Sequence, residues 1–377
     1  MKTKLVYVLT CAKEATYIEQ ALISIYSARY HNPDAHIVLL VDKKTDELLV
    51  GKRSEVLDYV TECKVVSAPS DYNVMQVSRW LKTNVRSFID GDFLFVDCDT
   101  VVTQSLKEID NLDCEIGAVL DTHRPVSKFN PRERVDLIKR ADLCGWDFSP
   151  VESYYSSGVL FVKDTFDTQR FYQQWHDNYN HSSSCGVNID QISFERTRQC
   201  VSIVKNIDDT YNTIMFIRPK FIEQAKIIHF ASLNNNSFLF SKRVLQYIRE
   251  NGLTLYLKYY IMHPMESYVP YMKKYFKGFA IFKTIRNVTR GVKQYARHID
   301  SSFVDLKIPL RIGKFIKKMY SLKLYYTATL LWMFWIHLTG KYNPLEKYYH
   351  GISDNRGEEE EGTLCDPIHP PHRQVEF

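Results

Sequence analysis

The sequence predicts an α/β fold in which a mostly parallel sheet is flanked by helices. Over residues 1–240, short apolar runs typical of strands alternate with segments whose apolar residues recur at helical spacing. Strands and helices that alternate along a chain form a parallel sheet with helices on both faces. The chain has 377 residues, 45% of them hydrophobic, which is enough for one such domain and an extension beyond it.

Three strands and two helices are expected in the first part of this domain. Leu5–Leu9 is a short apolar run and predicts the first strand, and Glu14–Arg29 has apolar residues at helical spacing. His36–Val41 is an apolar run that predicts a second buried strand. Asp46–Tyr59 predicts a helix, and Lys64–Ser67 predicts a short third strand.

The second part of the domain continues the alternation. Val77–Phe88 predicts a helix that leads into a fully apolar strand at Phe93–Val96. Glu115–Leu120 and Ser157–Val162 predict two further strands, and Phe166–Asn178 returns to helical spacing. In such sheets, ligands bind beyond the carboxyl ends of the strands.

Two carboxylates, Asp97 and Asp99, follow the Phe93–Val96 strand directly. Side chains at positions i and i+2 of an extended segment point the same way, so both can converge on one cation. Carboxylates with open positions beside them suit a hard divalent metal such as Mn²⁺ or Mg²⁺, which also holds phosphate oxygens. A solvated turn is the alternative, and the apolar residues on both sides favour the metal.

Some classes of protein are disfavoured because their motifs are absent. The sequence has neither G-x-G-x-x-G nor G-x-x-x-x-G-K-[ST], which argues against dinucleotide oxidoreductases and P-loop enzymes. The apolar part of Met1–Leu9 is too short for a signal peptide, so a cytoplasmic location is expected. The cysteines lack C-x-x-C spacing, which argues against a zinc site and a disulfide framework: Cys11, Cys63, Cys98, Cys114, Cys144, Cys185, Cys200 and Cys365.

Four stretches, in order over about residues 1–232, resemble the family 8 glycosyltransferases of the GT-A fold, which use nucleotide-diphosphate sugars. They are Tyr7–Ile25, Ser78–Asp99 with its D-x-D, Tyr155–Leu160, and Asn188–Gln191. The later family histidine is matched by His229, but the Gly and Lys-Pro-Trp that usually follow it are missing here. Ser156 stands where the family commonly has Asn, so the chain resembles a divergent relative.

The resemblance implies roles for individual residues. Asp99 would be the principal ligand of the metal, helped by Asp97 and His229, and Asp97 would contact either the ribose or the metal. Asp190 would bind sugar hydroxyls and Gln191 would lie near the anomeric carbon, with retention of configuration. The resemblance further implies that the donor is held by Thr10, Ala12, Tyr17, Asp42, Arg79, Lys82 and Asp97.

Several of these residues have an ordinary structural alternative. His229 lies on an apolar strand and could be a core histidine, and Tyr17 has the helical spacing of a core residue. Arg79 and Lys82 could belong to a solvated helix face. Asp190 could cap the helix that begins near Gln191. Asp42 is more often a turn residue than a nucleotide contact.

Residues 241–350 form a basic extension with 20 Lys and Arg against 5 Asp and Glu, rich in aromatic residues. This composition predicts helices on the anionic inner surface of a membrane. The long apolar stretches favour lipid over nucleic acid as the partner. Leu324–Gly340 has 17 residues without a charged side chain, and an interfacial helix is favoured there over a packed helix or a span. The acidic, Pro-containing tail 351–377 is expected to be disordered.

The sequence therefore predicts a peripheral membrane glycosyltransferase. It would move a sugar from a nucleotide-diphosphate donor, which the resemblance implies is UDP-linked, to a glycan or lipid-linked acceptor. A sugar-nucleotide nucleotidyltransferase is the first alternative, although Thr10–Glu14 lacks the Gly-rich loop such enzymes have after their first strand. A non-catalytic membrane-associated scaffold with a relic site is the second.

Overall fold

The computed structural model describes residues 1–129, 131–214, 224–231 and 239–264. The chain divides into two compact units, the first formed by residues 1–232 and 248–252 and the second by residues 233–247 and 253–377. Most of the second unit, including Leu324–Gly340 and the tail 351–377, lies outside the described residues. Among the helices that are described, none is long and apolar enough to cross a membrane.

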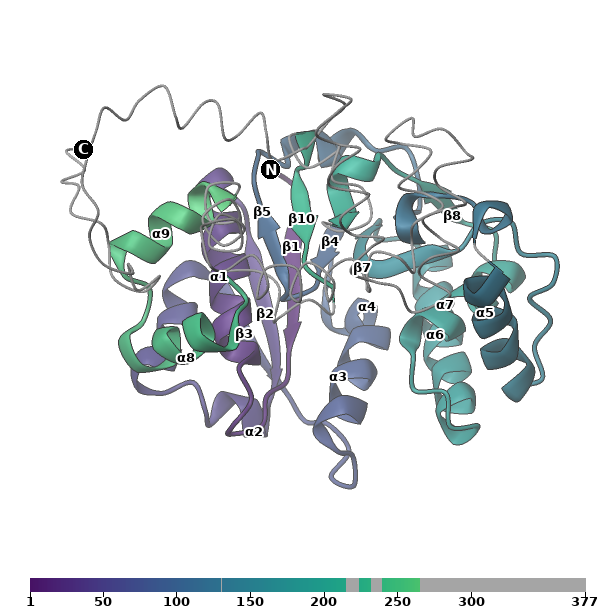
Figure 1. Ribbon diagram of the computed structural model, residues 1–377, viewed down its shortest axis with the longest axis horizontal. Helices are drawn as coiled ribbons and strands as arrows, with labels where there is room; N and C mark the ends of the chain where they lie inside the picture. The colour runs from purple at the N-terminus through teal and green to yellow at the C-terminus, as the bar shows by residue number, and fades with distance from the viewer. Residues whose placement is uncertain (130, 215–223, 232–238, 265–377) are drawn as a thin grey trace, which may run out of the picture. The chain divides into compact units, whose positions relative to one another are not determined.

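The first unit is built on a seven-stranded sheet. Its strands are β1 (Lys4–Leu9), β2 (Ile37–Asp42), β3 (Glu62–Val66), β4 (Phe93–Val96), β6 (Ile116–Leu120), β7 (Tyr155–Val162) and β8 (Val204–Asn206). Their spatial order is β3-β2-β1-β4-β7-β6-β8 (Figure 1). All neighbours pair in parallel except β7, which is antiparallel to both β4 and β6. The predicted α/β class with a mostly parallel sheet is confirmed.

The first unit also contains a second, three-stranded sheet, whose first strand follows β4 in the chain. It consists of β5 (Thr100–Val102), β9 (Thr213–Ile214) and β10 (Ile227–His229), with β10 in the middle. β10 pairs with β5 in antiparallel register, which sets His229 opposite Thr100. This pairing brings a residue from late in the chain to the segment that directly follows β4.

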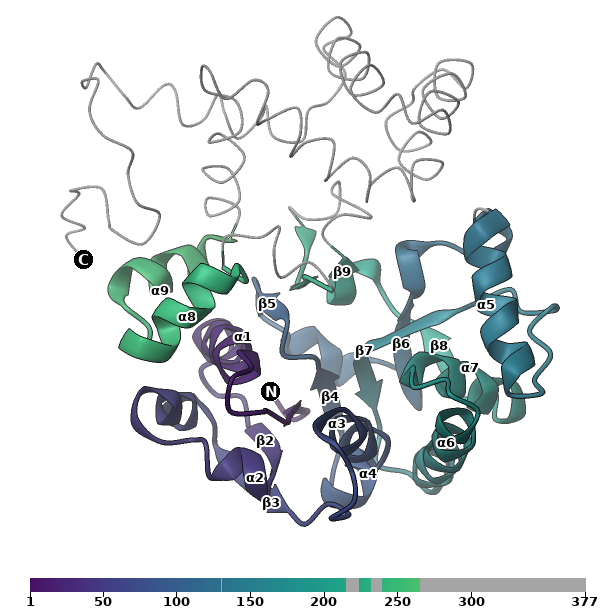
Figure 2. The same ribbon diagram turned by 60° about the horizontal axis from the view of Figure 1, so that its bottom comes forward.

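Helices cover both faces of the large sheet (Figures 1 and 2). Val6 of β1 packs in an apolar cluster that contains Trp175 of α6. Tyr7, which follows Val6 in β1, instead accepts a 3.4 Å hydrogen bond at its hydroxyl from Ser24 of α1. Because alternate side chains of a strand point to opposite faces, these two helical residues lie on opposite sides of the sheet. The helices are α1 (Tyr17–His31), α2 (Lys43–Asp46), α3 (Val74–Thr83), α4 (Val85–Phe88), α5 (Pro131–Leu143), α6 (Phe166–Ser184), α7 (Asp190–Cys200), α8 (Lys242–Asn251) and α9 (Leu255–Met262).

Two predicted helices differ from the structure. The expected helix Asp46–Tyr59 is instead the short α2 followed by a 3₁₀ helix at Gly51–Tyr59. Gly51 has a φ of +59°, a left-handed conformation that glycine adopts easily and that interrupts an α-helix. The expected helix Val77–Phe88 is divided into α3 and α4 at Asn84, whose side-chain amide donates back to the carbonyl of Trp80 at 2.8 Å.

Candidate metal centre

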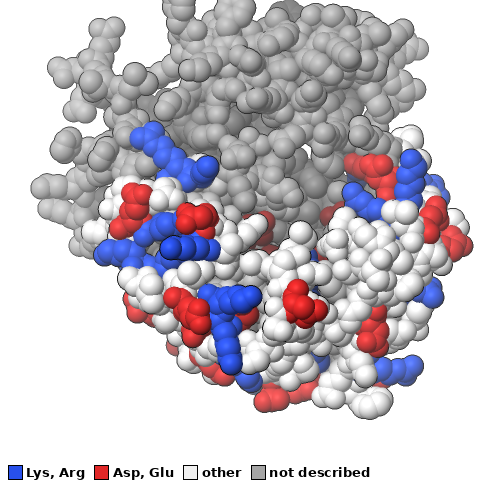
Figure 3. Space-filling view, turned by 90° about the horizontal axis from the view of Figure 1, so that it is seen from below, with Lys and Arg blue, Asp and Glu red and all other residues white. Residues whose placement is uncertain are grey.

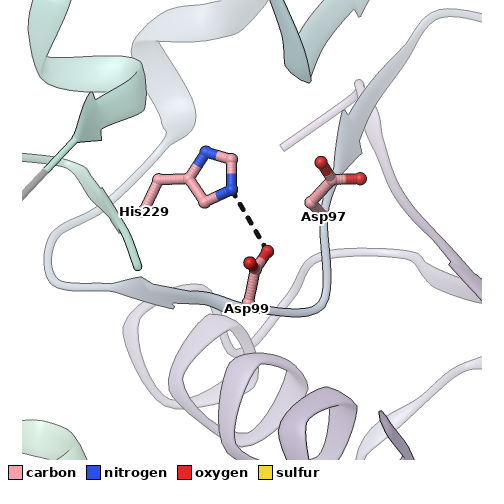
Figure 4. A group of neighbouring side chains, drawn as sticks. All are labelled: Asp97, Asp99 and His229. Carbon is pink, nitrogen blue, oxygen red and sulfur yellow. Dashed lines mark hydrogen bonds and ion pairs between the residues drawn. The ribbon is translucent and has the colours of Figure 1, made fainter. Parts of the chain in front are cut away.

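Asp97, Asp99 and His229 come together at the edge of the large sheet. Asp97 directly follows β4, Asp99 directly precedes β5, and His229 is the last residue of β10. One ligand atom from each lies within 4.8 Å of the others, and the side chains are directed toward one another (Figure 4). The two carboxylates therefore converge and His229 joins them, although Cys98 and Asp99 form a turn instead of the extended segment on which the i, i+2 argument relied.

Main-chain hydrogen bonds fix this convergence. The Asp97 amide donates to the carbonyl of Gly158 on β7 at 2.8 Å, which continues the pairing of β4 with β7. The amide of Phe230 donates to the Asp99 carbonyl at 2.9 Å, which ties the end of β10 to the start of β5. The backbone at Asp97 is thus held by the β4–β7 pair, and the backbone at Asp99 and His229 by the β5–β10 pair.

The three residues fit a divalent cation. Two carboxylates and one imidazole are a donor set that Mn²⁺ accepts in proteins, and Mg²⁺ suits the oxygen donors. Gly158 leaves the room that this set needs, because a Cβ there would lie 2.4 Å from His229 Cε1 and 2.9 Å from Asp97 Oδ2. The backbone of β7 approaches both ligands so closely that only glycine is accommodated.

Burial and mutual charge set the protonation of the three groups. Burial raises the pKa of Asp97, and the nearby Lys82 ammonium only partly opposes this effect. Burial also acts to raise the pKa of Asp99, but the charge and hydrogen bond of His229 outweigh it and the net pKa is lowered. Burial acts to lower the pKa of His229, yet Asp99 raises it overall. His229 Nε2 lies 3.1 Å from Asp99 Oδ1, and the two form an ion pair whenever the ring is protonated.

Lys82 connects this cluster to a second carboxylate. Its ammonium lies 3.3 Å from Asp97 Oδ1 and 3.0 Å from Asp190 Oδ2, and its side chain is only 4% exposed. It also lies 5.0 Å from the centre of the Phe95 ring. The alternative of a solvated face does not hold for Lys82. A direct contact with a diphosphate, as the sequence suggested, would require the ammonium to leave these partners.

Asp190 is buried and surrounded by donors. Its Oδ2 accepts a 2.8 Å hydrogen bond from Ser157, and its Oδ1 lies 3.1 Å from Nε of Arg79, which is one third exposed. Burial acts to raise the pKa of Asp190, but Lys82 and Arg79 lower it below its usual range. Asp190 is the first residue of α7, whose N-cap is Ile189 without a side-chain cap. The alternative that Asp190 caps this helix is therefore wrong.

Gln191 lies next to Asp190 and is partly buried. Its Nε2 is buried and finds no hydrogen-bond partner among the described residues. A buried donor without a partner costs about 1–3 kcal/mol. This amide is therefore able to donate a hydrogen bond to a ligand oxygen without losing a contact within the described fold.

The residues expected to hold the nucleotide follow β1 and β2, whose carboxyl ends lie at the same edge of the sheet as that of β4. The Thr10 hydroxyl donates to the Val74 carbonyl at 3.3 Å, and Ala12 is exposed. Tyr17 is 49% exposed, so its core alternative is wrong. Asp42 caps α2 and accepts from the Lys44 amide at 3.2 Å, as expected of a turn residue. The nucleotide contacts of these four residues remain predictions.

The structure adds three residues whose roles the sequence did not indicate. Ser157 and Gly158 stand in the stretch that resembles the family, but their contacts depend on how β7 pairs with β4. Asn212 lies 2.9 Å from the His229 ring and ends a short 3₁₀ turn. No spacing or composition signal marks an Asn in such an irregular segment.

Comparisons with known proteins find similarity only among solved structures. No family model and no curated protein matches the sequence. The galactosyltransferase LgtC in complex with donor and acceptor sugar analogues is 11% identical, with a TM-score of 0.42 over 62% of this chain and 88% of that one. Mouse xyloside xylosyltransferase 1 is 15% identical, with a TM-score of 0.41 over 62% of this chain and 98% of that one. The glycosyltransferase GlyE of Streptococcus pneumoniae is 16% identical, with a TM-score of 0.41 over 71% and 64%. These values are too low to identify an activity for this chain.

Proposed function

We propose that this protein is a metal-dependent glycosyltransferase that moves a sugar from a nucleotide-diphosphate donor, UDP-linked, to a glycan or lipid-linked acceptor. The convergence of Asp97, Asp99 and His229 at the carboxyl edge of the sheet carries the proposal. The resemblance of the sequence to family 8 enzymes of the GT-A fold supports it.

The cation of this proposal is Mn²⁺ or Mg²⁺, held by Asp97, Asp99 and His229. When bound, it supplies positive charge beside a diphosphate that becomes more negative as the glycosidic bond breaks. Arg79 adds fixed positive charge, and its partial exposure lets it reach a ligand. The positive charge of these groups stabilises the diphosphate as it departs.

Asp190 and Gln191 orient the sugar in this proposal. Asp190 stays ionised because Lys82 and Arg79 lower its pKa, so it accepts hydrogen bonds from sugar hydroxyls. Gln191 offers its unpartnered Nε2 near the anomeric carbon. Configuration is retained because the acceptor attacks from the side of the leaving group. The departing phosphate takes the acceptor's proton, so no nucleophile of the protein is needed.

The proposal is tested by the turnover of nucleotide sugars. A panel of UDP and other nucleotide sugars is first screened by thermal shift with and without Mn²⁺, because binding to the folded state raises its stability. Hydrolysis or transfer is then measured for the donors that bind. We expect metal-dependent turnover of a UDP-sugar. Release of pyrophosphate from a nucleoside triphosphate and sugar phosphate would indicate a nucleotidyltransferase, and indifference to every nucleotide would indicate a scaffold.

Asp99→Asn is the decisive variant for the metal. Loss of partners that only support metal ligands typically costs about 10–100-fold, so loss of a ligand is expected to lower turnover by at least about 100-fold. Asp58→Asn, at an exposed aspartate, is the matched control and is expected to keep its activity. Equal turnover of Asp99→Asn and the unchanged protein contradicts the metal role.

A further inference from the structure

The two nitrogens of His229 have different partners. Nε2 faces Asp99 Oδ1 at 3.1 Å, and Nδ1 lies 2.9 Å from Oδ1 of Asn212. An amide oxygen only accepts hydrogen bonds, so the ring nitrogen that faces it must carry a proton. Nδ1 is therefore the protonated nitrogen in every state of the ring that keeps this contact, and Nε2 is the nitrogen that can give up its proton to a cation.

The contacts of Ser156 agree with this orientation of the Asn212 amide. Its Nδ2 donates to Ser156 Oγ at 3.0 Å, and the same hydroxyl oxygen accepts the amide of Gly158 at 3.3 Å. When Nε2 binds a cation, the neutral ring carries its proton on Nδ1, and turning the amide over would then set its NH₂ group against that proton. Asn212 is completely buried, so no water replaces a lost partner. With Nε2 on a cation, donation therefore runs from His229 through Asn212 to Ser156.

The ring is also confined by packing. Gly158 follows Ser156 by two residues on β7 and faces His229 so closely that any Cβ there would overlap the ring. The imidazole therefore cannot swing away from Asn212 toward β7. Backbone pairing of β10 with β5 and the Asn212 contact then leave a single orientation, with Nε2 toward the two carboxylates.

We propose that Asn212, oriented by Ser156, is a positioning residue that holds the proton on Nδ1 of His229 and thereby presents Nε2 to the cation. This inference rests on the metal role in the proposed function. Partners of this kind commonly fix the tautomer of a metal-binding histidine and affect the affinity for the metal by about 10–100-fold. Asn212 itself touches neither cation nor substrate.

The test measures Mn²⁺ alone, by electron paramagnetic resonance of the full chain. Asn212→Leu keeps the branched heavy-atom shape but removes the acceptor, and it is expected to weaken Mn²⁺ binding about 10–100-fold. It is also expected to reduce the nitrogen coupling that a bound imidazole gives to Mn²⁺. Asn212→Asp keeps an acceptor for the Nδ1 proton and is expected to retain both the affinity and the coupling. Ser156→Ala, which frees the amide to turn, is expected to fall between them.

A matched control separates this effect from general loss of stability. Asn32 is also buried, with its Nδ2 donating to the Ala28 carbonyl and its Oδ1 accepting the Leu106 amide, and both partners lie outside the metal cluster. Asn32→Leu therefore removes a buried amide but is expected to leave Mn²⁺ affinity unchanged. Thermal unfolding without metal shows that each variant compared is folded at the temperature of the measurement.

The outcomes distinguish the inference from the proposed function. If Asn212→Leu binds Mn²⁺ as tightly as the unchanged protein, with the same nitrogen coupling, the inference is wrong while the metal role stands. If Asn212→Asp loses affinity as severely as Asn212→Leu, the hydrogen bond to Nδ1 is not what matters, and the inference is also wrong. If the unchanged protein does not bind Mn²⁺ at all, the metal role fails and the inference fails with it.

Discussion

Lys82 shows how much depends on one buried charge. Its ammonium is shared between Asp97 and Asp190, and both the Lys82 and the Asp190 side chains are almost inaccessible to water. Burial of one cation between two anions costs desolvation energy that the close contacts offset. The two candidate functions, metal binding and sugar binding, therefore share an ion-pair network and are expected to respond together to a change at this residue.

Lys82→Met is predicted to destabilise the protein strongly. Removing one partner of a buried ion pair typically costs about 3–5 kcal/mol because the remaining charge is left uncompensated. Urea denaturation measures the loss, and Lys43→Met, at an exposed lysine, serves as the control. Adding Asp97→Asn to Lys82→Met should recover part of the stability, since it removes the carboxylate that loses its ammonium partner, whereas Asp190 still pairs with Arg79. A double variant less stable than the single one would contradict this account.

Gly158→Ala is predicted to abolish Mn²⁺ binding while it lowers the stability of the fold only moderately. The new Cβ would meet His229 at 2.4 Å and Asp97 at 2.9 Å, so both ligands must move. Overpacking of a core typically costs about 1–3 kcal/mol. Gly117→Ala is the matched control. Its new Cβ would lie 2.6 Å from Ile207, so it is similarly crowded, but it does not meet Asp97 or His229. We expect the two variants to lose comparable stability, but Gly158→Ala to lose much more Mn²⁺ affinity than Gly117→Ala. Equal Mn²⁺ affinities of the two variants would count against the prediction.

The residues of the candidate site differ in how far the sequence predicts them. Asp97 and Asp99 are accessible to prediction because an apolar strand ends in front of them. His229 needs the resemblance as well, since an isolated histidine on an apolar strand is ordinarily a core residue. Asn212 is not predictable from local pattern, because its partner lies on β10 and its segment is irregular.

At the scale of elements, the pairing of strands decides the site. Apolar runs predicted most strands of the large sheet, but not that β7 inserts antiparallel between β4 and β6. That insertion supplies Ser157 and Gly158 to the cluster. The predicted helix Asp46–Tyr59 failed because Gly51 breaks it, and helical periodicity alone does not register the conformation of one glycine.

Glu19 at the start of α1 joins two distant elements. Its Oε1 accepts from Arg53 Nε at 2.7 Å and from Arg249 Nε of α8 at 3.1 Å, and the side chain is 1% exposed. Both arginines also donate to the carbonyl of Ala15, in the loop between β1 and α1. The loop that holds the predicted nucleotide contact Ala12 is thus fastened by two guanidinium groups.

Glu19→Gln is predicted to cost more stability than Arg249→Gln. The first leaves two partly buried guanidinium groups, with side chains 10% and 17% exposed, without a counter-charge, which costs up to about 3–5 kcal/mol. The second leaves Glu19 paired with Arg53, so only a charged hydrogen bond of about 1.5–3 kcal/mol is lost. Chemical denaturation measures both, with Arg170→Gln at an exposed position as control. The reverse order of the two losses would show that Arg53 and Arg249 do not share Glu19 in solution.

At the scale of the whole molecule, the described part and the basic extension differ in charge. Residues 1–240 carry 27 Lys and Arg against 32 Asp and Glu, and 241–350 carry 20 against 5. On the face in Figure 3, acidic and basic side chains of the described residues are interspersed. Such a surface gives little attraction to an anionic membrane. We therefore place the proposed membrane contact in residues 241–350, most of which lie outside the described residues.

The full chain is predicted to bind vesicles that contain anionic lipid. Each Lys or Arg near such a surface contributes about 1 kcal/mol, and salt screens this attraction within a Debye length of about 8–10 Å. In co-sedimentation, binding to vesicles with anionic lipid should therefore exceed binding to neutral vesicles and fall as salt rises. A chain ending at residue 264 keeps the described elements but loses most of the basic residues, and it should bind neither. If the shortened chain binds as well as the full one, the membrane contact lies elsewhere. If the full chain binds duplex DNA but not the anionic vesicles, the apolar stretches of 265–350 serve another purpose and lipid is the wrong partner.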